Sequence, residues 1–162
     1  NSLHRAIDHI NNASAGSYIL NLSAGIYQVT DAGGYEPDDV LMISPLNALT
    51  LQIQGAGIGS TIIDGNLAAS WMDGLDVHNA SNVIIADLEI MGFTLNGVHM
   101  GGAVDCIVEN CSLYNNLGSG VMIEDDGGTT PAHSSNNIVR NGCEIFKNKL
   151  GILICLGNSA SI

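Results

Sequence analysis

The sequence predicts an all-β solenoid in which short strands wind into a parallel β-helix. A glycine followed by alternating apolar residues occurs four times, beginning at Gly74, Gly97, Gly120 and Gly151. These glycines are 23, 23 and 31 residues apart, and such a period is typical of stacked repeat architectures. The alternation within each unit is that of strands with one buried face, and no long helical pattern separates the units.

A second series of strand-like segments repeats with the same spacing. Ile85, Val108 and Val139 begin segments that are 23 and then 31 residues apart. One insertion explains the longer interval in both series, and it is the polar loop from Asp126 to Asn136. Neighbouring coils of such a helix lie about 4.8 Å apart, so equivalent residues are expected to stack in columns.

We expect four of these columns to point into the interior. They are Leu75, Val98, Val121 and Ile152; Val77, Met100, Ile123 and Ile154; Leu88, Cys111 and Cys143; and Ile90, Leu113 and Ile145. Cys111 and Cys143 are predicted to be buried free thiols, because side chains in a parallel stack point alongside each other. Asn116 and Asn148 align at a turn, where their amides can satisfy backbone carbonyl groups.

The N-terminal residues are expected to close one end of the stack. Apolar residues recur at helical spacing over residues 3–12, which predicts an amphipathic capping helix. Strands are predicted over 19–22, 26–29, 40–43, 49–53 and 61–63, with polar or glycine-rich turns between them. We predict one domain over residues 1–162, with coils from residue 17. Its far end is predicted to be uncapped, so that either further chain or a partner would cover it.

Two of these segments carry a resemblance to a known family. Gly120–Ile123, followed by Asn137–Asn141 and Ile145–Asn148, resembles the repeat of right-handed parallel β-helices in the pectin-lyase-like superfamily. The opening from Ser2 to Tyr27 resembles the entry of such helices in secreted and surface proteins. The resemblance implies a right-handed winding but leaves function open, because lyases, hydrolases, epimerases and adhesins share this scaffold.

The candidate site lies on the outward positions of the first repeated strand. Its proposed catalytic residues are Asp76, His99, Glu124, Asp125 and Asp126, with His78 nearby. Carboxylates beside a histidine suit general acid–base chemistry. The last three acidic residues also suit Ca²⁺, which prefers carboxylate and carbonyl oxygens. A third interpretation is that these polar side chains only keep the surface soluble.

Several features count against catalysis at this face. The lyases that the chain resembles use an Arg or Lys base, but none of the four basic residues maps beside the acidic cluster. Of the hydrolase motifs, only Asp125-Asp126 has a match. The outward column becomes apolar at Met122 and Leu153, and Trp71 and Tyr114 are the only aromatic residues expected near it. Whether the chain is an enzyme is therefore left open.

Composition and charge restrict the partners. The net charge of −12 opposes nucleic acids, and it opposes anionic polysaccharides unless divalent cations bridge the two. The sequence has no apolar run of about 20 residues that would span a membrane. No cofactor other than Ca²⁺ is suggested, since the Gly55–Gly59 turn lacks the lysine and helix of a phosphate loop. Asn-x-Ser sequons at Asn12, Asn21, Asn79 and Asn110 favour a secreted protein.

Together these observations predict an extracellular or cell-surface β-helix with a structural or adhesive role. It would self-associate, for example into a filament, or bind a surface partner through its open end or its apolar outer strip. The alternative is a polysaccharide-active enzyme, a lyase, hydrolase or epimerase, with a polysaccharide as its partner and Ca²⁺ as its cofactor.

Overall fold

The computed structural model describes residues 2–30, 41–68, 71–126 and 133–155. It contains three parallel sheets, here called A, B and C. Sheet A consists of β1 (Gly16–Asn21), β4 (Leu49–Gln54), β7 (Val83–Ala86), β10 (Ile107–Glu109) and β13 (Ile138–Arg140). Sheet B consists of β2 (Gly25–Thr30), β5 (Thr61–Leu67), β8 (Glu89–Met91), β11 (Ser112–Tyr114) and β14 (Glu144–Phe146). Sheet C consists of β3 (Met42–Ile43), β6 (Leu75–His78), β9 (Val98–Gly101), β12 (Ser119–Glu124) and β15 (Leu150–Cys155).

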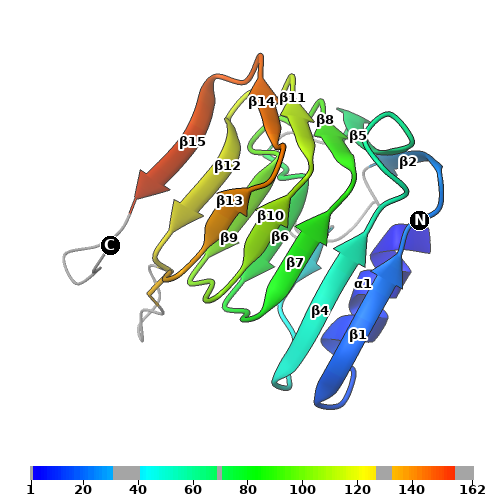
Figure 1. Cartoon of the computed structure of the whole chain (residues 1–162), viewed down its shortest axis with the longest axis vertical. Coiled ribbons are helices and arrows are strands. Elements are labelled where there is room, and N and C mark those ends of the chain that lie inside the picture. Colours follow the sequence, from blue (N-terminus) through cyan, green and yellow to red (C-terminus); the bar gives the residue numbers. More distant parts are fainter. Residues whose placement is uncertain (1, 31–40, 69–70, 127–132, 156–162) are drawn as a thin grey trace.

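Successive strands go to sheets A, B and C in turn, so each coil adds one strand to every sheet (Figure 1). The predicted register is confirmed, because Val98 pairs with Leu75 on one side and with Val121 on the other. Val121 pairs in turn with Ile152. The fold is therefore the predicted right-handed parallel β-helix. Within the described residues, no helix is both long enough and apolar enough to cross a membrane.

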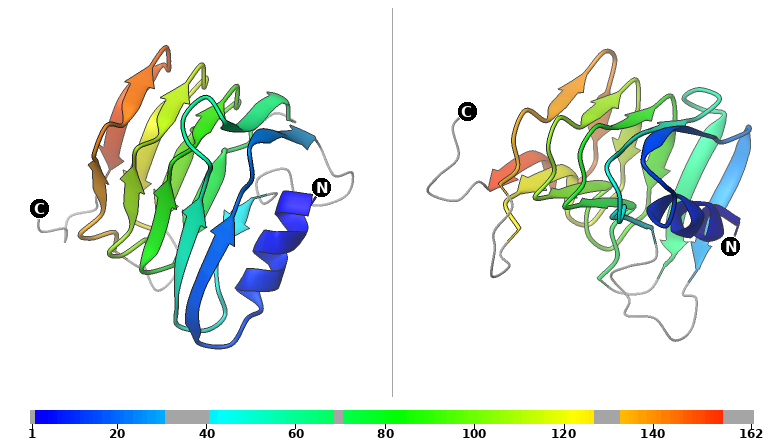
Figure 2. Two further views of the ribbon diagram at one scale, coloured as in Figure 1. Left: turned by 45° about the vertical axis from the view of Figure 1, so that its right-hand side comes forward. Right: turned by 90° about the horizontal axis from the view of Figure 1, so that it is seen from below.

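Helix α1 (Ser2–Asn11) closes one end of the stack, as predicted. Its apolar side chains Leu3, Ile7 and Ile10 are buried in the core. The Asn11 side chain attaches the helix to the first coil: its amide donates to the Met42 carbonyl (2.8 Å), and its oxygen accepts from the Ser44 amide (3.0 Å). The helix lies at the end of the molecule opposite β15 (Figure 2).

The coil formed by β13, β14 and β15, here called the end coil, differs from the coils before it in the burial of its inward columns. Val121 and Ile123 are 0% and 6% exposed, whereas their partners Ile152 and Ile154 on β15 are 48% and 58% exposed. The predicted columns are therefore correct in register, and among the described residues their members in the end coil are covered on one side only.

The repeated glycines form a column of their own in which the backbones are too close for a side chain. A Cβ atom on Gly74 would lie 2.3 Å from the Gly97 carbonyl oxygen, and one on Gly97 would lie 2.8 Å from the Gly120 oxygen. A Cβ on Gly151, in the end coil, would meet no atom within 4 Å. Close packing between coils thus explains why a glycine occurs at the start of each repeated strand.

The corners between sheets place Asn and Asp residues in the left-handed region. Asn82, Asp105 and Asn136 precede strands of sheet A with φ values of 59°, 56° and 56°. Asn and Asp tolerate this conformation better than other residues with a side chain. They are again 23 and 31 residues apart, so the polar turns in the sequence mark the same corner in successive coils.

The predicted asparagine stack is confirmed. Asn148 accepts a hydrogen bond from the Asn116 amide (3.0 Å) and donates one to the Leu113 carbonyl (2.8 Å). Asn116, which is buried, accepts in the same way from the Phe93 amide (3.0 Å). Each side chain thus supplies hydrogen bonds to backbone groups at the turn between sheets B and C, which would otherwise have no partner in the neighbouring coil.

Both predicted thiols are free, but only Cys111 is buried as predicted. Cys111 is a buried free cysteine, and burial raises the pKa of its thiol to about 12. Cys143, its neighbour in the end coil, is free and half-buried. The predicted polar loop over residues 31–39, the start of the predicted strand 40–43 and most of the loop inserted after Asp126 lie outside the described residues.

Candidate functional site

The outward face of sheet C carries three of the predicted site residues on three consecutive strands. Asp76 on β6 pairs with His99 on β9, and His99 pairs with Met122 on β12. Glu124, also on β12, pairs with Gly101 and therefore belongs to the neighbouring outward column. Neighbouring strands are about 4.8 Å apart, and outward side chains on one face can contact both the directly opposite residue and the diagonal one. These three side chains can therefore contact one another although they come from different coils.

His99 lies at the centre of this cluster and contacts carboxylates with both ring nitrogens. Its Nδ1 is 2.9 Å from Asp76 Oδ1, and its Nε2 is 3.0 Å from Glu124 Oε1. A third carboxylate, Asp73, has its Oδ2 3.8 Å from the same Nδ1. The imidazole therefore connects the coil before it with the coil after it.

The surrounding carboxylates keep His99 charged at neutral pH. Burial alone would lower the pKa of His99, but the hydrogen bond and charge of Asp76, the charge of Asp73 and the hydrogen bond to Glu124 outweigh it and raise this pKa to about 9. The imidazolium then donates one N–H to each neighbouring carboxylate. A histidine in this state neutralises acidic neighbours and cannot accept a proton as a general base at pH 7.

Asp73 belongs to the cluster but was not among the predicted site residues. It precedes β6 in the sequence, and its Oδ1 accepts hydrogen bonds from the Asn96 backbone (2.8 Å) and side-chain amide (2.9 Å). Burial raises the pKa of Asp73 above its usual range, although the bonds from Asn96 and the charge of His99 oppose this. Asp73 is thus the carboxyl group of the cluster that holds its proton more strongly than usual.

The 23-residue spacing of the repeat also includes Asp73, so this residue could have been predicted from the sequence. Asn96 follows Asp73 by 23 residues, and Ser119 follows Asn96 by 23. The Asn96 side-chain oxygen accepts from the Ser119 backbone amide at 2.7 Å, just as Asp73 accepts from Asn96. The three residues form a second polar ladder, at the corner that leads into sheet C.

Asp125 and Asp126 contact residues outside this cluster. Asp125 accepts a hydrogen bond from the Ser134 backbone (2.9 Å) and lies 3.1 Å from His133 Nδ1. Asp126 accepts from the Asn79 side chain at 2.9 Å. The five predicted residues are therefore divided: Asp76 and Glu124 contact His99, while Asp125 and Asp126 connect the chain after β12 to Ser134, His133 and the corner at Asn79.

The predicted Ca²⁺ ligands Glu124, Asp125 and Asp126 accordingly point to different partners. Across the described ranges, no group of three or more His, Cys, Asp or Glu side chains is arranged to hold a metal ion. The Ca²⁺ site stays a prediction.

His78 borders this face, whereas Tyr114 lies on a different sheet. His78 lies beside the cluster, because a Cβ on Gly101 would be 3.3 Å from both His78 Nδ1 and His99 Cε1. Tyr114, expected near this face, instead belongs to sheet B, where it stacks on Phe146 with ring centroids 5.0 Å apart. Its hydroxyl donates to Glu89 at 2.9 Å. Outward residues of sheet B cannot reach the face of sheet C.

The comparison with known families agrees with this architecture. Residues 47–162 match the family described as the right handed beta helix region. The chain belongs to this family. Neither the curated proteins nor the solved structures contain a significant match to it. The family match covers the coils from β4 onward, including every residue of the His99 cluster, and it describes a β-helix module without assigning an activity.

Proposed function

We propose that this chain is a structural β-helix module that associates with a second copy of itself through the end coil. The observation that supports this is the exposure of Ile152 and Ile154, which occupy columns that are buried in the coils before them. Burying apolar surface contributes about 25 cal/mol per Å², so a continuous apolar column is a favourable contact area.

The backbone of the end coil supports the same proposal. Among the residues that the structure describes, β13, β14 and β15 lie at one end of sheets A, B and C. A terminal strand has one edge of N–H and C=O groups that is not paired within its sheet, and such edges readily pair with another chain. The opposite end of the stack is different, because α1 lies there with its apolar side chains buried.

Light scattering of the purified chain over a range of concentrations tests this proposal. We expect reversible self-association that Ile154→Asp weakens at least about tenfold, since a buried unpaired charge is strongly unfavourable. Ile19→Asp is the matched control, because Ile19 is also an exposed isoleucine on a strand but lies at the α1 end. A chain that stays monomeric at millimolar concentration, or equal weakening by both substitutions, would refute the proposal.

We further propose that the module functions outside the cell. Its four sequon asparagines, Asn12, Asn21, Asn79 and Asn110, are all exposed, although the Asn79 and Asn110 side chains donate hydrogen bonds to Asp126 and Asp87, and the Asn12 side chain donates one to the Asp8 carbonyl. Detection of the protein on intact cells by an antibody, with no signal increase after lysis, is the expected result. A signal found only after lysis would contradict an extracellular location.

A second candidate function is acid–base catalysis on a polysaccharide, and the protonation of the His99 cluster favours it. Asp73, with a raised pKa, and the carboxylates Asp76 and Glu124 surround one imidazole. This combination offers both proton donors and acceptors. Product release from a panel of uronate and neutral glycans, with and without Ca²⁺, tests it. We expect Asp76→Asn to abolish such activity and Asp105→Asn, an exposed residue elsewhere, to preserve it.

A further inference from the structure

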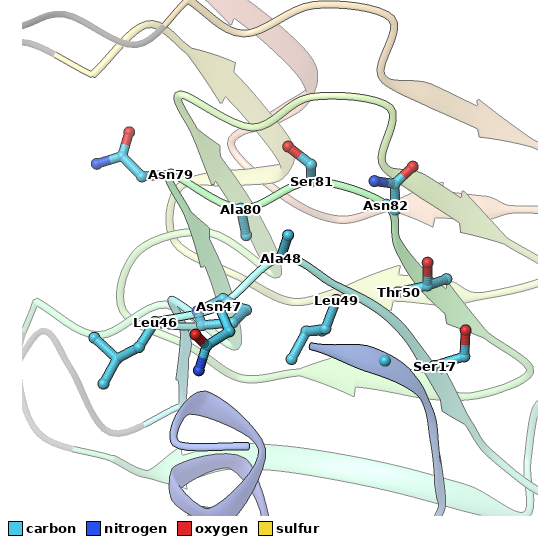
Figure 3. A pocket seen from close by; sticks show the side chains of 12 residues that line it. Ser17, Leu46, Asn47, Ala48, Leu49, Thr50, Asn79, Ala80, Ser81 and Asn82 are labelled. Carbon is cyan, nitrogen blue, oxygen red and sulfur yellow. The ribbon is translucent and has the colours of Figure 1, made fainter. Parts of the chain in front are cut away.

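A pocket of about 540 Å³ lies at the corner where sheet C leads into sheet A, on the side of the molecule that α1 closes. Three successive coils contribute to its walls, through residues 16–17, 45–50 and 79–82 (Figure 3). It is separate from the His99 cluster, since none of Asp73, Asp76, His99 and Glu124 lines it.

One wall of the pocket is a column of hydroxyl and amide side chains. Ser17 pairs with Thr50, and the next pair along the strands is Leu51 with Val83, which places Asn82 beside Thr50. All three are exposed, and their side chains make no hydrogen bond to another described residue. Because neighbouring strands are about 4.8 Å apart, the column offers a polar group at each such step.

The centre of the pocket is apolar and shallow. Ala48 and Ala80 lie between the polar column and the side chain of Leu46 (Figure 3). Leu46 is 79% exposed and so offers apolar surface to the pocket. An apolar floor bordered by hydroxyl and amide groups suits a ligand with one C–H face and a rim of hydroxyl groups.

The pocket walls are held in place by contacts outside the pocket. The Leu46 backbone amide donates to the Asn11 carbonyl (2.9 Å), and the Asn47 side chain donates to the Ala13 carbonyl (2.9 Å). On the other side, Asn79 is fixed by its bond to Asp126. A binding site formed in advance loses less conformational entropy when a ligand binds.

The charge of the surroundings restricts the ligand. None of the residues that line the pocket is ionisable. Asp126 lies just outside it, and the chain carries a net charge of −12, so an anionic ligand would be repelled. We propose that this pocket binds a neutral carbohydrate, with the C–H face of a sugar ring on Ala48 and Leu46 and its hydroxyl groups on Ser17, Thr50 and Asn82. This proposal is independent of association through the end coil.

Saturation-transfer NMR and calorimetry on the whole chain test the proposal, with cellotetraose, xylotetraose and maltotetraose as neutral probes, trigalacturonate as the anionic probe, and glucose and glycerol as small probes. We expect at least one neutral tetraose to bind and trigalacturonate not to bind. Glucose binding as tightly as the tetraoses would also support the proposal and identify a free monosaccharide as the ligand.

Two substitutions locate the binding. Thr50→Val removes one hydroxyl group while keeping a β-branched residue on the strand, and it should weaken binding about 3- to 10-fold, the effect of one lost hydrogen bond. Ala48→Phe fills the pocket and should abolish binding. Thr30→Val, an exposed threonine on β2, is the matched control and should leave binding unchanged. Circular dichroism of each variant confirms that it folds.

The proposal is overturned if no neutral sugar binds, if trigalacturonate or glycerol binds as tightly as the best neutral sugar, or if binding survives Ala48→Phe in a folded variant. It is also overturned if Thr30→Val weakens binding as much as Thr50→Val does.

Discussion

At the scale of single residues, His99 shows how an outward polar side chain can hold coils together. Each of its ring nitrogens contacts a carboxylate from a different strand, Asp76 on β6 and Glu124 on β12. An isolated surface ion pair contributes little to stability, but this imidazolium is only about one-seventh exposed, at 15%, and contacts two acceptors at once. It therefore acts as a charged link across three consecutive coils.

The raised pKa of His99 predicts a pH-dependent stability. Because its pKa in the folded state is about 9, above the unfolded value of about 6.5, the contribution of His99 is complete below about pH 6.5 and is lost as pH rises through 9. Its size is about 3 kcal/mol. Urea unfolding from pH 6 to 10 should show this loss, and titration of the His99 ring by NMR should give the midpoint.

Comparing the pH-dependent stability of wild type with that of His99→Gln isolates the contribution of His99. Buried thiols such as Cys111, whose pKa burial raises to about 12, also make the folded state less stable at high pH. These thiols are present in both proteins, so only the difference between wild type and variant reports on His99. If the difference in stability were the same at pH 6 and pH 10, the proposed charge link would be wrong.

Some of the contacts around His99 could be predicted from the sequence and others could not. The spacing of 23 placed Asp76 and His99 in one column, and the structure confirms this register. The spacing could not show that Glu124 reaches sideways from the neighbouring column, because that depends on side-chain rotamers. Asp73 was missed for another reason: it lies before the strand, where no apolar alternation marks the positions, although it obeys the same period.

At the scale of elements, the glycine column determines how closely coils can stack. Gly74→Ala would place a methyl group 2.3 Å from the Gly97 carbonyl oxygen and close to Ile90, so backbone or core atoms must move. Overpacking of this kind costs about 1–3 kcal/mol. Gly151→Ala is a matched control at the same repeat position, because a Cβ there meets no atom within 4 Å.

We therefore expect Gly74→Ala to lower the free energy of unfolding, measured in urea, by about 1–3 kcal/mol and Gly151→Ala to change it by less than about 0.5 kcal/mol. Equal effects would mean that glycine is needed for its conformation alone and not for close approach of the coils. The strands themselves could be predicted well, because alternation and period act together. Their ends were less predictable: β1 begins at Gly16, three residues before the predicted strand, since pairing with β4 extends it.

At the scale of the whole molecule, charge is distributed unevenly along the stack. Three of the four basic residues, Arg140, Lys147 and Lys149, lie in residues 138–155, together with a single acidic residue, Glu144. The end coil is thus locally basic in a chain with a net charge of −12. Arg140 contacts Glu109 in the coil before it, at 3.0 Å.

This distribution predicts how self-association through the end coil depends on salt. Because α1 closes the opposite end, we expect two end coils to face each other, which gives a closed dimer and no filament. Two basic surfaces then repel each other, and added NaCl screens that repulsion. Sedimentation equilibrium should show a dimer that becomes tighter between about 50 and 500 mM NaCl.

A charge-swapped variant provides the control for this prediction. Lys147→Glu combined with Lys149→Glu should form a heterodimer with wild type at low salt more readily than either forms a homodimer. Polymers longer than a dimer, or association that weakens as NaCl is added, would show instead that unlike ends meet.

The one-sided cover of the end coil also bears on the order in which the molecule opens. In a stack where each repeat touches only its neighbours, a terminal repeat has about half the stabilising contacts of an internal one. Amide hydrogens of β13, β14 and β15 should therefore exchange with deuterium first, and protection should rise coil by coil toward α1. Unwinding of this solenoid would then begin at β15 and travel in one direction, toward the helix.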